Sequence, residues 1–178
     1  MLTTVCVLLP ALSLFSANSQ DVEVIDQDGN TVHFYGELIK DRVVAINFIF
    51  TNCQTICTVL GAKFAKVDKL LSDRHVSGVR LISISVDPVN DRPEQLRRFA
   101  ARYGVTHQWK LVTGDKGNIE QLLRSLGEYS PEKTAHTGLT LIGRGGGNWV
   151  RVDGLGPAER IADFLTVDAA QRSARNGQ

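Results

Sequence analysis

The chain has 178 residues, of which 43% are hydrophobic and 22% are charged. These values are typical of one globular domain and argue against intrinsic disorder. The 20 basic and 19 acidic residues give a net charge of +1, which argues against a strong nonspecific affinity for nucleic acid or anionic lipid. Three cysteines are too few for a disulfide scaffold or for a four-cysteine zinc site.

Residues 1–19 contain no charged side chain, and their apolar run over 5–15 has the length of a signal-peptide core. The run is shorter than the ~20 apolar residues that a membrane span needs, and Pro10 interrupts it. Because no Lys or Arg precedes the run, a buried N-terminal segment or a different start is the alternative. We expect a signal peptide over 1–19, one domain over 20–168, and a flexible polar tail over 169–178. The mature chain is then expected outside the cytoplasm, in the periplasm or an equivalent compartment, free or associated with a membrane.

The residues after this segment alternate between strand and helix patterns. Strands are predicted over 21–26, 31–35, 43–50, 79–86, 109–112, 139–142 and 149–152. Helices are predicted over about 55–71, 91–103 and 119–126, and from Pro157 onward with Ile161, Phe164 and Leu165 facing inward. A turn at 27–30 joins the first two strands into a hairpin. The order predicts an α/β fold with a mixed central sheet and helices on both faces.

Cys53 and Cys57 follow the most apolar predicted strand, where a helix is expected to begin. Residues four apart share a helix face, and the positive end of the helix dipole favours the thiolate that metals and disulfide exchange need. Cβ atoms at this spacing on a regular helix lie ~5–6 Å apart, whereas a disulfide needs ~3.8 Å. A bridge therefore requires Cys53 to lie on the loop before the helix. A metal needs no such closure, since thiolate–metal bonds of ~2.3 Å span a wider gap.

The cysteine pair also fits a plain packing role. Apolar residues recur at steps of four and three along this helix, at Cys53, Cys57, Leu60, Phe64, Val67 and Leu71. Free cysteine often behaves as a small buried hydrophobe. The strand-to-helix junction favours a functional site, because ligands bind beyond the carboxyl ends of strands in open α/β sheets.

Other groups of polar residues carry weaker signals. The histidines His33, His75, His107 and His136 each have the spacing of a surface or packing residue, and periodicity selects none of them as a metal ligand. The arginines Arg97, Arg98 and Arg102 are interpreted as the solvated face of their helix.

Two stretches resemble the signature blocks of the Sco/SenC family. Residues 48–57, FIFTNCQTIC, resemble its strand and CxxxC motif, and residues 82–94, ISISVDPVNDRPE, resemble its second block. A single histidine before a late strand, His136, completes the pattern, and the resemblance extends from about residue 21 to residue 165. It implies a thioredoxin-like fold with an extra hairpin. It also implies copper bound by two thiolates and one imidazole, and a role in assembling the binuclear copper centre of cytochrome c oxidase.

Carried onto this sequence, the resemblance makes Cys53 and Cys57 the sulfur ligands and the redox pair, and His136 the nitrogen ligand. Soft thiolates select Cu(I), and imidazole also suits copper, with Cu(II) as the other oxidation state. The implied partners are the copper-binding subunit of cytochrome c oxidase or another copper chaperone, together with a thiol-disulfide reductant. Asp87 matches the acidic position of the second block, or else it is a turn residue at a strand end.

The sequence departs from the family pattern at two positions. Thr58 stands where the family usually has proline, and Ala135 stands where it often has an acidic residue before the histidine. Without a carboxylate at 135 to orient the imidazole, we expect lower metal affinity or faster transfer.

Three functions stay open at this point. The first is a copper-delivery protein that is not an enzyme. The second is a thiol-disulfide oxidoreductase that acts on the cysteines of another protein. The third is a peroxiredoxin-like peroxidase, in which Cys53 attacks peroxide and Cys57 resolves the oxidised thiol.

Overall fold

The structure, a computed structural model, describes the backbone of residues 21–53, 55–106, 108–132, 138–145 and 149–176, with side chains as far as residue 171. The strands are β1 (Glu23–Asp26), β2 (Thr31–His33), β3 (Val43–Ile49), β4 (Val79–Ser85), β5 (Trp109–Thr113), β6 (Leu139–Arg144) and β7 (Val150–Asp153). The helices are η1 (Phe34–Ile39), α1 (Ile56–Asp73), α2 (Pro93–Tyr103), α3 (Lys116–Leu126) and α4 (Ala158–Asn176).

The strands form one sheet in the order β2-β1-β5-β4-β3-β6-β7, with β2 and β7 outermost. Strands β3, β4 and β5 are parallel, and the remaining pairs are antiparallel. Every residue of β3 is buried, as expected of a parallel strand covered on both faces. The mixed sheet and the N-terminal hairpin β1-β2 confirm the predicted fold.

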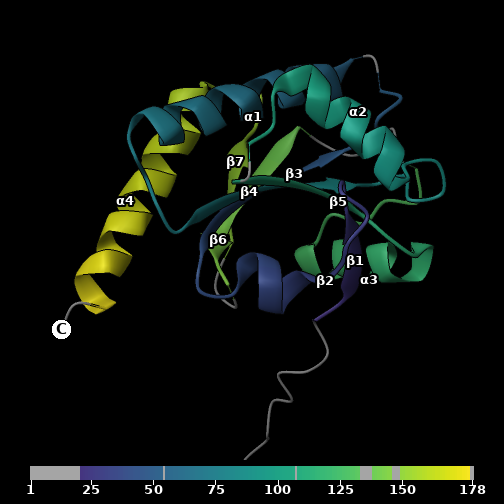
Figure 1. Cartoon of the computed structure of the whole chain (residues 1–178), viewed down its shortest axis with the longest axis horizontal. Helices are drawn as coiled ribbons and strands as arrows, with labels where there is room; N and C mark the ends of the chain where they lie inside the picture. The colour runs from purple at the N-terminus through teal and green to yellow at the C-terminus, as the bar shows by residue number, and fades with distance from the viewer. Residues whose placement is uncertain (1–20, 54, 107, 133–137, 146–148, 177–178) are drawn as a thin grey trace, which may run out of the picture.

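Helices cover both faces of the sheet (Figure 1). Helices α1, α2 and α4 pack on one face, where the Phe64 and Trp109 rings meet at 5.7 Å. Helices η1 and α3 pack on the other face, where they bury Phe34 and Ile119. Two cores therefore sandwich the strands, and β3 contributes to both through its alternating side chains.

The second strand is shorter than predicted. It ends at His33, and a π-helix over Phe34–Ile39 follows. The amide of Lys40 donates to the carbonyl of Tyr35, and the carboxylate of Asp21 accepts from the amides of Tyr35 and Gly36. These contacts provide acceptors for three backbone amides of the turn. The alternation of apolar and polar residues predicts a strand here and gives no sign of the turn.

The C-terminal helix also differs from the prediction. Helix α4 continues to Asn176, so the segment from Ala169, expected to be a loose tail, is helical over most of its length. Phe164, expected to face inward, is 44% exposed, whereas Ile161 and Leu165 are buried as predicted. The expected signal peptide lies outside the described residues. None of the described helices has the combined length and hydrophobicity needed to cross a bilayer.

Candidate functional site

The cysteine pair lies at the carboxyl end of β3. Cys53 lies on the loop after the strand, where its amide donates to the carbonyl of Phe50 over 3.1 Å. Cys57 lies in the first turn of α1, which begins at Ile56. Both are free thiols, with Cys57 fully buried and Cys53 8% exposed. The loop position of Cys53 is the one that the sequence argument required for a bridge between the two.

The sulfur of Cys53 accepts a hydrogen bond from the amide of Cys57 over 3.4 Å and lies 3.6 Å from the hydroxyl oxygen of Thr55. Burial opposes ionisation of this thiol, but the hydrogen bonds from Cys57 and Thr55 outweigh burial. They hold the pKa of Cys53 below its ordinary value of 9.0. Cys53 is therefore the thiol that ionises first, and a thiolate is the form that attacks disulfides and binds metals.

Cys57 has the opposite electrostatic environment. Burial, followed by the hydrogen bond with Cys53, raises the pKa of Cys57 to about 12, and the negative charge of Asp91 contributes in the same direction. The pKa values of the two thiols are therefore shifted in opposite directions, although the residues are only four positions apart. A thiol that ionises more readily, next to a fully buried thiol that holds its proton more tightly, suits stepwise disulfide exchange.

Asp91 holds the loop that carries Cys53. Its carboxylate accepts from the amide of Thr51 over 3.0 Å, from the Thr51 hydroxyl, and from the Ser85 hydroxyl over 2.7 Å. Burial raises the pKa of Asp91 above its ordinary value, although these hydrogen bonds oppose the shift. Asp87, and not Asp91, was the acidic residue expected at the site. In the sequence, Asp91 is marked only as a second acidic residue, four positions after Asp87 in the same block.

Asp87 has the turn role that the sequence analysis offered as its alternative. Its amide donates to the Ser85 hydroxyl over 3.1 Å, and its carboxylate accepts from the side-chain amide of Asn90 over 2.9 Å. It therefore caps the turn between β4 and α2, next to the acid that contacts the cysteine loop.

His136 lies outside the described residues, but the segment that carries it is flanked by described neighbours. A Cβ on Gly138 would lie 3.1 Å from Cδ1 of Ile56, the residue before Cys57. On the other side, Glu132 and Asp87 line one hollow of about 620 Å³. Both flanks of the segment therefore border the cysteine end of the sheet.

Neither of the two histidines that the structure describes forms a group with the cysteines. His33 and His75 are exposed, on β2 and in the turn after α1, and His107 lies outside the described residues. Within the described part of the chain, no three His, Cys, Asp or Glu side chains are grouped closely enough to hold a metal ion.

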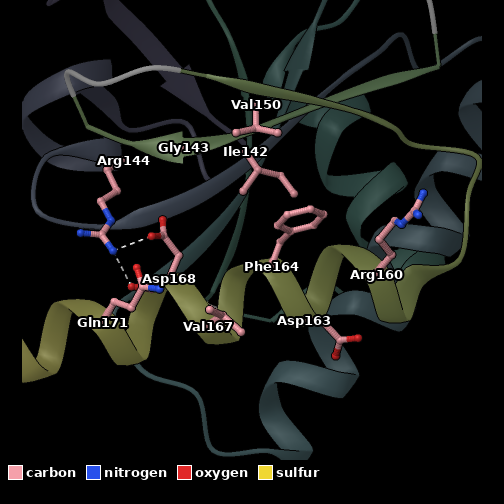
Figure 2. Close-up of a pocket in the computed structure, with 10 residues that line it drawn as sticks. All are labelled: Ile142, Gly143, Arg144, Val150, Arg160, Asp163, Phe164, Val167, Asp168 and Gln171. Atoms are coloured by element: carbon pink, nitrogen blue, oxygen red, sulfur yellow. Dashed lines mark hydrogen bonds and ion pairs between the residues drawn. The ribbon is translucent and has the colours of Figure 1, made fainter.

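A larger hollow, of about 820 Å³, lies at the other end of the molecule between α4 and strands β6 and β7. Arg144 in its wall is paired with Val43 at the start of β3, whereas the cysteines follow the end of that strand. In Figure 2, Phe164 points toward Ile142 and Val150, and Arg144 contacts Asp168. None of the described residues that line this hollow is a cysteine or a histidine.

Comparisons with known proteins show which proteins this chain is similar to. A family model described as SCO1/SenC matches residues 14–162. The SCO1 protein homolog of Bacillus subtilis is 43% identical over 98 residues, 54% of this chain and 49% of that protein. A putative copper-binding protein of Stutzerimonas stutzeri is 30% identical over 103 residues, 58% of this chain and 47% of that protein.

The chain thus spans about half the length of the curated relatives it matches. Among solved structures, BsSco, described as a member of the Sco family of cytochrome c oxidase assembly proteins with a disulfide switch, superposes with a TM-score of 0.71. It is 31% identical, and the superposition covers 83% of this chain and 91% of that one.

Proposed function

The chain belongs to the SCO1/SenC family, and we propose that it binds Cu(I) through Cys53, Cys57 and His136 and delivers it during assembly of the copper centre of cytochrome c oxidase. The proposed recipient is the copper-binding oxidase subunit or another copper chaperone. Relatives described as copper-binding and as oxidase assembly proteins support the copper part of the proposal. The uncharged apolar run over 5–15 supports an extracytoplasmic location.

The observation that carries the proposal is the pair of free thiols at the end of β3. The amide of Cys57 lies 3.4 Å from the sulfur of Cys53, so the two residues are in contact across the start of α1. Two thiolates and one imidazole are the soft and borderline donors that copper prefers. In this proposal, Cys53 supplies one thiolate from the loop that Asp91 holds, Cys57 supplies the other from the first turn of α1, and His136 supplies the imidazole.

The residues of the chain have separate roles in this scheme. Cys53 ionises readily and makes the first bond to incoming copper, whereas Cys57 must lose its proton on binding. Copper bound to both sulfurs replaces that proton and compensates for burial of the thiolate. Reduction of a Cys53–Cys57 bridge, by an external dithiol reductant, prepares the site for the next ion.

A second candidate function is thiol-disulfide exchange without copper, and the asymmetry of the two thiols favours it. A lowered pKa at Cys53 beside a raised one at Cys57 is the arrangement of an attacking and a resolving cysteine. The peroxidase alternative uses the same two residues, and rapid peroxide consumption by the reduced chain would favour it.

Copper loading of the reduced chain separates these functions. We expect one Cu(I) per chain with two sulfur neighbours by copper-edge X-ray absorption, and loss of tight binding in His136→Ala with dithiol exchange retained. His33→Ala, which removes an exposed histidine on β2, is the matched control and keeps copper. Unchanged copper binding in His136→Ala would remove that residue from the site. Failure of the wild-type chain to retain copper would contradict copper delivery and favour thiol-disulfide exchange as the function.

A further inference from the structure

Cys53 borders a hollow of about 430 Å³, and the other residues that line it are Thr51, Asn52, Thr58 and Arg102. Cys57 is fully buried and does not line this hollow. A partner therefore reaches the cysteine pair through the Cys53 side, and what lines the hollow determines which partner chemistry fits. Among the described residues of this lining, Arg102 is the one with a charged side chain, and Thr51, Asn52 and Thr58 are polar.

The end of α2 is held against the start of α1, and this contact places Arg102 beside the cysteine loop. The hydroxyl of Tyr103 donates to the carbonyl of Thr58 over 3.3 Å. The ring centroids of Phe99 and Tyr103 lie 4.7 Å apart, with the two rings tilted by 49°. Both rings lie next to Gly61, where an added Cβ would be 2.7 Å from the Tyr103 ring. The glycine thus permits the close approach of the two helices that brings the last turn of α2 to the hollow.

The guanidinium of Arg102 has no carboxylate partner among the described residues, and no acidic side chain lines the hollow. One turn earlier on the same helix, Arg98 pairs with Glu94 over 2.6 Å. Both arginines are exposed, as expected of the solvated face of their helix. They differ because Arg98 pairs with Glu94, whereas Arg102 lines the hollow beside Cys53.

We propose that Arg102 binds a carboxylate that the partner polypeptide carries next to its own reactive cysteine, and so directs acidic cysteine segments to Cys53. This inference rests on the proposed use of Cys53 in thiol exchange or copper transfer, and it adds the chemical class of the partner. A positive charge in a partly enclosed hollow favours anionic reactants over neutral ones of the same size. Thr51, Asn52 and Thr58 offer hydrogen-bonding groups around the same position.

The exchange step in which this selectivity is measured is balanced as follows. The Cys53 thiolate attacks one sulfur of a disulfide, the S–S bond breaks, and one thiolate leaves as a mixed disulfide forms on Cys53. Cys57 then loses its proton to solvent and attacks the sulfur of Cys53, which releases the second thiolate. The chain is oxidised by two electrons to the Cys53–Cys57 disulfide, and the probe is reduced to two thiols.

The test compares an anionic and a neutral disulfide probe on the reduced full chain in a Cys6→Ser background. The probes are 5,5′-dithiobis(2-nitrobenzoate), which carries two carboxylates, and 4,4′-dithiodipyridine, which is neutral at neutral pH. In Arg102→Gln we expect the rate with the anionic probe to fall by about two- to five-fold, the range of one exposed charge pair. The rate with the neutral probe stays unchanged, and Arg98→Gln, the matched control, changes neither rate.

Two further measurements define the ligand. Raising the salt from about 0.1 M to about 1 M, where the screening length falls to ~3 Å, abolishes the difference between wild type and Arg102→Gln. Disulfide-linked peptides with Glu beside the cysteine react faster than their Gln counterparts in the wild type only. Sensitivity to the small probe without sensitivity to the peptides would overturn the assignment of a polypeptide partner.

An equal fall with both probes, or no fall with either, would overturn the proposal, because neither result depends on the charge of the reactant. A wild-type chain in which Cys53 reacts with neither probe would overturn it as well. Charge selectivity in a chain that retains no copper would leave the role of Arg102 intact and reject only the copper part of the proposed function. The two proposals can therefore fail separately.

Discussion

The backbone amide of Cys57 donates a hydrogen bond to the sulfur of Cys53 over 3.4 Å. This contact exists because Cys53 precedes the helix, so its side chain folds back over amides that have no acceptor in the first turn. The start of the helix therefore donates an amide hydrogen bond to the Cys53 sulfur, as it would to the carboxylate of a capping residue. The Cys57 sulfur, inside the first turn, is fully buried.

The two thiols should titrate in widely separated pH ranges. In a Cys6→Ser background, Cys57→Ser leaves a thiol at 53 that still receives the backbone amide of residue 57, and we expect it to ionise below the ordinary value of 9.0. Cys53→Ser leaves the thiol at 57, and we expect its pKa to stay above 9.0 because burial and the charge of Asp91 still raise it. Thiolate absorbance in the ultraviolet against pH measures both. Coinciding curves for the two variants would contradict the asymmetry.

Asp91 should make stability depend on pH in a predictable direction. Its folded pKa is above the ordinary value of 3.8, so between these two values the folded chain holds a proton that the unfolded chain has released. Stability from this group is present below 3.8 and is lost as the pH rises through the folded value.

The variant Asp91→Asn removes this titration and places an amide where one acceptor oxygen was, at a cost of ~1–3 kcal/mol. The free energy of unfolding of the wild type minus that of Asp91→Asn should fall as the pH rises above 3.8 and then level off. Denaturant titrations across pH measure the difference. A constant difference would mean that Asp91 is ionised throughout this range.

Gly61 should be sensitive to a single added methyl group. In Gly61→Ala the new Cβ would lie 2.7 Å from the ring of Tyr103 and 3.0 Å from that of Phe99. Overpacking of this kind costs ~1–3 kcal/mol, and we expect the free energy of unfolding to fall by that amount. Gly117→Ala in α3 is the control, since nothing lies within 4 Å of its Cβ, and stability there stays equal or rises. Equal effects at both positions would contradict the close helix contact.

Two phenylalanines should differ sharply when truncated. Phe64 is fully buried against Trp109, and Phe64→Ala should lower the free energy of unfolding by ~3–5 kcal/mol. Phe164 is 44% exposed, so Phe164→Ala should cost clearly less. Chemical denaturation of both variants provides the comparison. A loss at Phe164 as large as that at Phe64 would mean that the hollow between α4 and β7 is closed in solution.

Sequence patterns predicted the elements whose periodicity is set by burial. The all-apolar β3 and the helix after it follow directly from side chains that must leave water, and the junction between them located Cys53 and Cys57. A bridge between the cysteines requires Cys53 to lie on the loop before the helix, and the structure places it there. The stripe that made a packing role plausible is real as well, since Cys57 is buried in the same core as Phe64.

The parts that sequence reasoning missed depend on contacts between distant residues. Asp91 acts on Thr51 across 40 positions, and no local pattern connects the two. Arg102 shares its spacing with Arg98, and only the packing of α2 on α1 distinguishes their surroundings. Phe164 fits the helical period of an inward residue, but it lines the open hollow between α4 and strands β6 and β7 and is 44% exposed. His136 as a copper ligand stays a prediction.

The sheet ends in short strands at both sides, β2 with three residues and β7 with four. An outermost strand carries backbone groups that a neighbouring molecule could pair with, and the length of that strand sets how many such bonds a second chain can form. Exposed charge at Arg151 and Asp153 on β7 adds a further obstacle to stacking molecules edge to edge. These short, charged edges limit edge-to-edge aggregation of the reduced chain, in which no disulfide joins the cysteine loop to α1.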